Sequence, residues 1–183
     1  MEHAITPPDI ITFWYSDRVR PLHWRAEPAF DRELAETFGA THEAAIAGEL
    51  DGWLATPDGA LALVIVLDQL SRNLHRGTPR AFAADGLARR HLRHALARGL
   101  DKALLRDRRG FLYMPLMHSE NPLDQARSVE LFATLEEANT LRFAYLHKDI
   151  VDRFGRFPHR NAILGRINTP EETEFLTQPG SGF

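Results

Sequence analysis

The sequence has no cysteine, and it uses only 2 lysines against 20 arginines among its 183 residues. Without cysteine, the chain cannot form a disulfide framework, a thiolate nucleophile, an iron–sulfur site or a cysteine-ligated zinc site. No stretch approaches the roughly 18 consecutive apolar residues that a membrane-spanning helix needs. The opening residues, MEHAITPPDI, also lack a basic segment followed by an apolar one. We therefore expect a cytoplasmic protein with no membrane partner.

Several catalytic and nucleotide-binding signatures are also missing, namely HExxH, the P-loop, GxSxG and the dinucleotide-binding fingerprint. The formal net charge of −3 and a pI near 6.3 provide no broad basic field for a nucleic acid. We expect no nucleic-acid partner, no cofactor and no metal. The metal is disfavoured because no pair of histidine and carboxylate four residues apart lies on a core face, although ligands distant in sequence could still converge.

The composition favours helices, because alanine and leucine together number 47 whereas valine and isoleucine number only 13. Five Thr-Pro or Asn-Pro pairs are typical of a helix N-cap followed by proline in the first turn. Thr169-Pro170-Glu171-Glu172 is the most complete, since Glu172 can form a capping box. The predicted helices span residues 7–15, 28–47, 57–73, 79–98, 101–114, 122–136, 139–154 and 170–176.

No linker divides the sequence, so we predict one all-α domain over residues 1–183, with a loose tail over 176–183. Antiparallel helix pairs of this kind fit either a bundle or a short solenoid of helical hairpins. The chain shows no strict 34-residue repeat that would decide between the two.

An apolar run over residues 60–67 is predicted to be a centrally buried helix. It ends in DQLSRN, where Asp68 and Arg72 lie four residues apart on one helix face. A carboxylate at the end of a buried helix needs a cationic partner. The pair either forms a structural salt bridge between helices or lines a pocket.

A second apolar run, residues 111–117, contains Pro115, which is expected to break or kink the helix. Three polar residues follow it. Ser119 fits a local cap, whereas His118 and Glu120 fit an acid/base pair.

The predicted helix over 139–154 carries His147 on its apolar stripe, where a histidine is usually a core residue. Beyond it, residues 153–168 hold four arginines and no acid, a local charge of +4. Arginine presents a planar fork of donors that suits a carboxylate or a phosphate. An anion is therefore expected nearby, either internal (Asp68, Glu120 or Asp124) or a bound ligand.

Three phrases of the sequence together resemble one family: LALVIVLDQLSRNLHRGTPRAF, FLYMPLMHSENPLDQARSVELF and HKDIVDRFGRFPHRNAILGRINTPEETEFL. They are similar to the bacterial family called domain of unknown function 924, over roughly residues 9–176. The resemblance implies an all-α fold of antiparallel helical hairpins, arranged as a tetratricopeptide-like right-handed superhelix in a cytosolic protein. It implies no established activity.

Residue by residue, the resemblance places the family's polar motifs on the polar residues that follow or interrupt the apolar runs described above. Ser71 and His75 depart from the family pattern, which speaks against His75 as a catalytic residue. The candidate ligand-binding residues are Asp68, Gln69, Arg72, Asn73, His118, Ser119, Glu120, His147, Arg153, Arg156, His159, Arg160 and Asn161.

The leading hypothesis is an interior polar cluster that binds a small anionic metabolite or a peptide carboxylate. Arg156 and Arg160 would clamp the anion. A second hypothesis is a metal-independent hydrolase or lyase with His118 as general base, Glu120 as its orienting carboxylate, and the same two arginines stabilising negative charge. A third is a scaffold that holds a partner protein between helical hairpins. Catalytic residues are not assigned.

Overall fold

A computed structural model describes residues 4–182 of the chain, and within that range the regular structure is helical, with no strand. This confirms the all-α prediction. The chain divides by its internal contacts into two compact units. The first unit comprises Met1–Arg76 with Arg80–Pro115, and the second comprises Gly77–Pro79 with Leu116–Phe183. The sequence carries no linker at the second boundary, which falls inside a helix.

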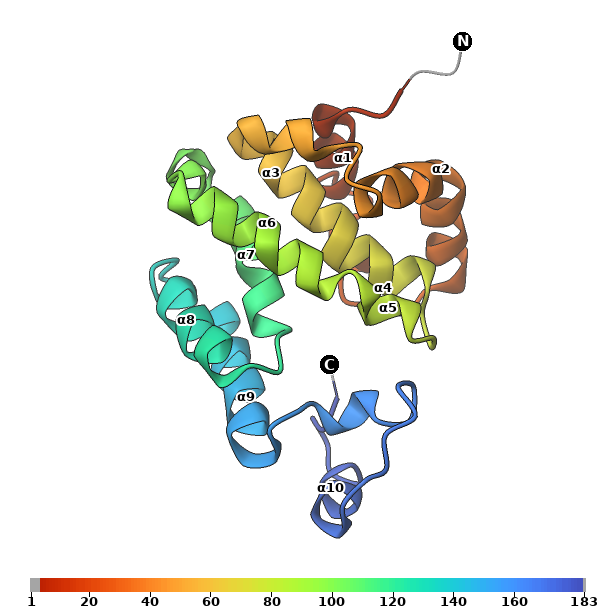
Figure 1. The fold of residues 1–183 in the computed structure, drawn as a ribbon, viewed down its shortest axis with the longest axis vertical. Coiled ribbons are helices and arrows are strands. Elements are labelled where there is room, and N and C mark those ends of the chain that lie inside the picture. The colour runs from red at the N-terminus through yellow and green to blue at the C-terminus, as the bar shows by residue number, and fades with distance from the viewer. Residues whose placement is uncertain (1–3, 183) are drawn as a thin grey trace. The chain divides into compact units, whose positions relative to one another are not determined.

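The helices of the chain are labelled in Figure 1. Those of the first unit are α1 (Pro7–Trp14), α2 (Pro28–Ile46), α3 (Pro57–Val64), α4 (Ser71–Leu74), α5 (Arg80–Ala83), α6 (Asp85–Ala97) and most of α7 (Arg106–Met117). A π-helical stretch, Ile65–Leu70, joins α3 to α4. The second unit contains α8 (Pro122–Ala133), α9 (Ala138–Phe154) and α10 (Pro170–Phe175), with a 3₁₀ turn at Pro158–Arg160.

The centre of the first unit is α3 with its π-helical extension. Every residue from Ala60 to Leu67 has zero exposure, which confirms the prediction of central burial. Both α1 and α6 pack against α3, as Figure 1 shows. A helix that is apolar on all faces is stable only when neighbours cover each of them.

Gly59, in the first turn of α3, has no room for a side chain. A Cβ placed there would lie 2.0 Å from the backbone oxygen of Trp53. We therefore expect Gly59→Ala to lower the free energy of unfolding by at least about 1 kcal/mol, because backbone atoms would have to move. A Cβ added to Gly39, inside α2, would meet no atom within 4 Å, so Gly39→Ala should instead stabilise by about 0.5–1 kcal/mol. Urea unfolding followed by circular dichroism measures both, and equal effects would contradict the steric argument.

Two predicted helices differ most from the structure. The segment 79–98 is divided at Ala84, which places Asp85 in the first turn of α6, where a carboxylate interacts favourably with the helix dipole. The segment 101–114 begins later, at Arg106, and continues through Pro115 to Met117. Pro115 does not end α7, because a proline in the last turn removes only one hydrogen bond of a helix that is about to end.

The second unit is built on the adjacent helices α8 and α9 (Figure 1). Gly155 has a φ of 68° and ends α9 in the left-handed conformation that glycine favours. The chain then turns back, so that Phe157 packs with Ile150 and Val151 of α9, and Phe175 of α10 covers this cluster. The loop rich in arginine is therefore anchored on both sides by apolar contacts.

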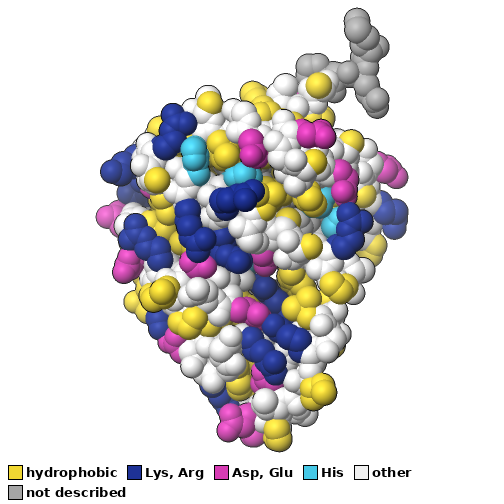
Figure 2. Space-filling model, in the orientation of Figure 1, with side chains coloured by type: hydrophobic (Ala, Val, Ile, Leu, Met, Phe, Trp, Pro, Cys, Tyr) yellow, Lys and Arg dark blue, Asp and Glu magenta, His cyan; other side chains and the backbone are white. Residues whose placement is uncertain are grey.

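Charged side chains of both signs are interspersed with apolar ones over the face of the molecule in Figure 2. Within residues 4–182, each helix is too short or too polar to cross a bilayer.

Candidate functional site

The first unit contains a buried ion cluster at the end of the π-helical stretch. Asp68 has zero exposure, and its Oδ1 lies 3.3 Å from Nη1 of Arg72. The same guanidinium donates to both carboxylate oxygens of Asp85, at 3.0 and 3.2 Å, and to the backbone oxygen of Asp68 at 2.5 Å. The neighbouring carboxylates raise the pKa of Arg72 against the opposing effect of burial. The cationic partner predicted for Asp68 is confirmed.

Gln69 and Asn73 also make structural contacts within the first unit. The amide of Gln69 donates to Oδ2 of Asp68 at 2.6 Å. Asn73 donates to Oδ1 of Asp31 on α2 at 2.8 Å, and Arg76 donates to the same carboxylate. Arg72 ties α4 to α6, and Asn73 ties α4 to α2. These contacts favour the structural salt bridge over a pocket at this place.

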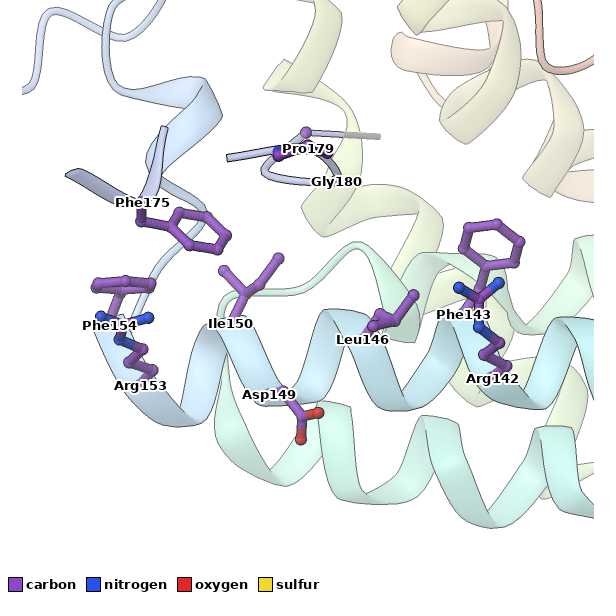
Figure 3. Close-up of a pocket in the computed structure, with 11 residues that line it drawn as sticks. Arg142, Phe143, Leu146, Asp149, Ile150, Arg153, Phe154, Phe175, Pro179 and Gly180 are labelled. Carbon is purple, nitrogen blue, oxygen red and sulfur yellow. The ribbon is translucent and has the colours of Figure 1, made fainter. Parts of the chain in front are cut away.

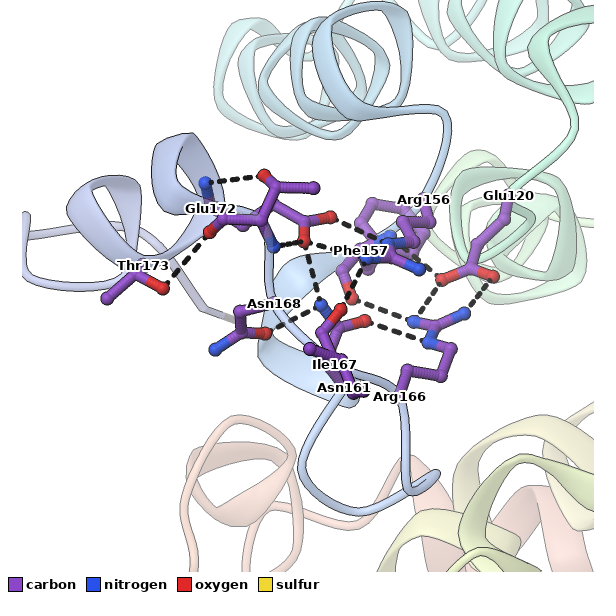
Figure 4. A network of polar contacts seen from close by, with 10 residues as sticks. Glu120, Arg156, Phe157, Asn161, Arg166, Ile167, Asn168, Glu172 and Thr173 are labelled. Carbon is purple, nitrogen blue, oxygen red and sulfur yellow. Dashed lines mark hydrogen bonds and ion pairs between the residues drawn. The ribbon is translucent and has the colours of Figure 1, made fainter.

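In the second unit, Glu120 is the partner of Arg166. The two side chains form a bidentate pair, with Nη1 and Nη2 of Arg166 at 2.8 and 2.9 Å from the carboxylate oxygens (Figure 4). The backbone N–H of Phe157 also donates to Glu120, at 2.8 Å. Although partial burial opposes it, hydrogen bonding by Arg166 and by this N–H lowers the pKa of Glu120.

A second bidentate pair joins Arg156 to Glu172. Nε and Nη2 of Arg156 lie 2.6 and 2.7 Å from the carboxylate oxygens of Glu172, which is 1% exposed. Asn161, fully buried, connects the two pairs (Figure 4): its amide donates to Glu172 and its oxygen accepts from Arg166. Two of the four arginines of this loop, Arg156 and Arg166, therefore pair with carboxylates of the protein itself. The sequence predicts Glu172 only as a helix-capping residue, not as the partner of an arginine.

These contacts correct two of the predicted roles. In the structure Arg156 is engaged by Glu172, so it would have to break a buried ion pair before it could clamp a ligand. Glu120 was expected to orient His118, but within residues 4–182 its carboxylate is bonded to Arg166 and to the Phe157 N–H. A carboxylate held bidentately by arginine is a poor partner for a general base. The described contacts of Glu120 therefore do not support its assigned role beside His118, and the hydrolase or lyase hypothesis stays a prediction.

Three of the remaining candidates, His147, His159 and Arg160, lie against the Phe157 ring, and His118 lies next to His147. His147 is 5% exposed and its Nδ1 lies 2.8 Å from the backbone oxygen of Phe143, so Nδ1 carries the proton. The ring centroids of His147 and His118 are 5.9 Å apart. Burial, and then the nearby His118, lower the pKa of His147 to about 3, so its imidazole is neutral at physiological pH. The expectation that His147 belongs to the core is confirmed.

Arg160 and His159 complete this cluster. The guanidinium carbon of Arg160 lies 4.7 Å from the centroid of the Phe157 ring, and Nη2 donates to the backbone oxygen of His118 at 3.0 Å. The ring of His159 is 5.6 Å from that of Phe157. Ser119 takes the local role expected of it, because its hydroxyl donates to Asp124 at 2.7 Å and accepts from the Asn121 N–H.

Arg153 lies apart from this network, in a groove of about 450 Å³ along α9 (Figure 3). Phe143, Leu146, Ile150 and Phe154 contribute apolar surface from α9, and Phe175 does so from α10. The charged residues of the groove are Arg142, Arg153 and Asp149. Arg142 is a member that the sequence analysis missed. It lies eleven positions before Arg153, and that spacing of about three turns places both on one helix face.

The structure therefore brings together most of the predicted residues, but in separate groups. Asp68, Gln69, Arg72 and Asn73 belong to the first unit. The second unit contains His118, Ser119, Glu120, His147, Arg153, Arg156, His159, Arg160 and Asn161. That the two groups share one pocket stays a prediction.

Fold and contacts define an all-helical protein of two compact units, each with a buried arginine–carboxylate network. The chain belongs to the family described as bacterial protein of unknown function (DUF924), whose model matches residues 10–180. This confirms the resemblance. A solved structure of protein of unknown function ATU0120 from Agrobacterium tumefaciens is similar, with 42% identity and a TM-score of 0.89. The match covers 93% of this chain and 96% of that one. No curated protein matches the chain significantly.

Proposed function

We propose that this protein binds a short acidic peptide in the groove along α9, with Arg153 and Arg142 holding the peptide carboxylates. The observation that supports this proposal is that both guanidinium groups lie over aromatic rings and have no carboxylate partner within residues 4–182. Arg153 lies over the rings of Phe154 and Phe175, at 4.6 and 5.9 Å, and Arg142 lies over Phe143 at 5.8 Å. Within residues 4–182, neither guanidinium forms a salt bridge with a carboxylate. Both can therefore accept an anion without giving up an internal one.

The charge and the surface of the groove suit a ligand that is both acidic and apolar. Two arginines against one aspartate, Asp149, give the lining a net charge of +1. The aromatic and aliphatic side chains between them offer apolar contacts to the parts of the ligand between its carboxylates. A guanidinium above an aromatic ring keeps its outer N–H groups directed to one side, which reduces the entropy lost on binding a carboxylate.

The length of the groove favours a peptide over a small metabolite. Eleven residues of helix separate Arg142 from Arg153, which corresponds to about 16 Å at a rise of about 1.5 Å per residue. An extended peptide advances about 3.3 Å per residue, so about five residues span that distance. Such a ligand fits a tetratricopeptide-like protein, whose helical hairpins present grooves of this kind. The right-handed superhelix and the cytoplasmic location remain predictions.

The test measures binding of a fluorescein-labelled pentapeptide, Asp-Leu-Asp-Leu-Asp, by fluorescence anisotropy. We expect saturable binding to the wild type that Arg153→Gln weakens about two- to fivefold, since an ion pair at an exposed arginine contributes at most about 1 kcal/mol. Arg142→Gln should weaken binding as well, and the double variant more than either. Raising the salt concentration should also weaken binding.

The matched control is Arg127→Gln, which removes an exposed arginine of α8 that pairs with Glu130 at 2.6 Å. It should leave the anisotropy titration unchanged. A peptide with asparagine in place of each aspartate should not bind. Equal loss in Arg127→Gln and Arg153→Gln, or equal binding of the two peptides, would show that the attraction is unspecific and would refute the proposal.

A further inference from the structure

His42 of α2 is held in one tautomer by a chain of hydrogen bonds in the first unit. Its Nε2 lies 2.7 Å from Oγ of Ser71, and that hydroxyl donates its proton to the backbone oxygen of Leu67 at 2.6 Å. A serine hydroxyl has only one proton. Ser71 must therefore accept from His42, so Nε2 carries the hydrogen.

The other ring nitrogen of His42 consequently presents a lone pair. His42 has zero exposure, and its Nδ1 is a buried atom with no hydrogen-bond partner in the part of the chain that the structure describes. The nearest acid, Glu43, places Oε1 3.7 Å from this nitrogen. Buried polar atoms in proteins almost always have a partner, so an exception requires an explanation.

Two further groups, His75 and Glu43, lie close to the His42 ring. His75 ends α4, and its ring centroid is 5.2 Å from that of His42. One ligand atom from each of His42, Glu43 and His75 lies within 4.8 Å of the other two. The three residues come from α2 and from the end of α4, and these helices pack against each other.

We infer that His42, Glu43 and His75 form a binding site for a divalent transition-metal ion, with Zn²⁺ as the best match. Two imidazoles and one carboxylate are a donor set that zinc prefers, with a fourth position left for water. Bonds of about 2.0–2.2 Å in a tetrahedron require ligand atoms about 3.3 Å apart. The existing separations, which are at most 4.8 Å, must contract, and the exposed side chain of Glu43 can move to allow it.

The hydrogen bond from His42 to Ser71 would orient the His42 ring as a metal ligand. Ligating histidines commonly donate their second N–H to a neighbouring oxygen, which fixes the ring and its tautomer. Burial lowers the pKa of His42 and of His75, and this keeps both rings neutral, as metal ligation requires. Among the charged groups around the three ligands, Arg80 opposes the ion, because its Nη2 lies 2.6 Å from Oε1 of Glu43.

The primary experiment is equilibrium dialysis of the purified full chain against Zn²⁺, with bound metal measured by elemental analysis. We expect one zinc per chain, and a Kd at least about tenfold weaker in His75→Asn and in Glu43→Gln. The partly exposed positions of these two residues make the variants suitable, whereas a substitution of the buried His42 could prevent folding. The matched control, His94→Asn, changes an exposed histidine of α6 and should bind as the wild type does.

Two more measurements separate a metal site from a structural histidine pair. Arg80→Gln removes the competing cation and should tighten zinc binding about fivefold, an effect that a structural role does not predict. Nitrogen-15 spectra of the metal-free protein should show His42 protonated at Nε2. No retained zinc, unchanged affinity in both His75→Asn and Glu43→Gln, or a proton on Nδ1 of His42 would each overturn the inference.

Discussion

Replacing Arg72 with methionine is expected to lower the free energy of unfolding by about 3–5 kcal/mol, because two buried carboxylates lose their shared cation. Asp68 has zero exposure and Asp85 is 7% exposed, so neither charge can be solvated without local unfolding. Methionine fills a similar volume, which separates the loss of charge from the creation of a cavity. Urea unfolding followed by circular dichroism gives the free energy directly.

Two variants serve as controls for this result. Arg72→Lys keeps the charge but loses the fork that engages both oxygens of Asp85, so it should recover only part of the loss. Arg98→Met removes an exposed arginine after α6 and should change stability by less than about 0.5 kcal/mol. If Arg72→Met is no more harmful than Arg98→Met, the cluster contributes little to stability.

The local part of this cluster was predictable and the distant part was not. Asp68 and Arg72 lie four residues apart after an apolar run, and helical periodicity alone places them on one face. Asp85 is thirteen residues beyond Arg72, across the break at Ala84, and no short-range pattern relates the two. Helical periodicity predicts that Asp68 pairs with Arg72. That Asp85 is the second partner of Arg72 depends on tertiary packing.

The arginine-rich loop shows the same division. Its charge and its tight turn at Gly155 follow from the sequence, and so does the need for an anion. The sequence does not identify which residue supplies that anion. Glu172 is sixteen residues from Arg156, and its position in the capping box already explains an acidic residue there. A residue that already has a local explanation is easily excluded from a search for long-range partners.

The residues that α9 contributes to the groove follow a helical spacing that is visible in the sequence. Arg142 and Arg153 lie about three helical turns apart, and Phe143, Leu146, Ile150 and Phe154 follow the same face. Periodicity alone assigns these apolar residues to a core stripe. Phe143 is 38% exposed, because this edge of the stripe faces the groove. By contrast, the approach of His75 to His42 depends on how α4 packs against α2, and no spacing in the sequence predicts it.

Among the carboxylates of the described residues, Glu172 is the one with the largest expected pH effect. Its side chain is 2% exposed, and its carboxylate accepts from Arg156, from the backbone N–H of Thr169 at 2.8 Å and from Asn161 at 3.3 Å. Hydrogen bonding by Arg156, followed by that of the Thr169 N–H, lowers the pKa of Glu172 from 4.5 to about 2. The folded protein therefore holds this carboxylate in its charged form more strongly than the unfolded chain does.

Because the folded pKa lies below the unfolded one, Glu172 contributes stability that is fully present above pH 4.5 and is lost as the pH falls towards 2. We expect Glu172→Gln to lower the free energy of unfolding by about 2 kcal/mol at pH 7, a value reduced from the full pKa difference to allow for solvent screening. The variant should also lose less stability than the wild type between pH 4.5 and 2. Urea titrations at several pH values measure both effects.

The matched control is Glu33→Gln, which removes an equally bidentate partner, that of Arg18, from an exposed pair whose distances are 2.6 and 3.0 Å. Exposed ion pairs contribute about 0–1 kcal/mol, so this variant should be nearly neutral at pH 7. The difference between the unfolding free energies of the two variants measures how much burial and the additional hydrogen-bond donors add to the stability that Glu172 contributes. If Glu172→Gln retains the acid sensitivity of the wild type, the titrating group of this region is another carboxylate, and Glu120, which is held by Arg166, is the next to test.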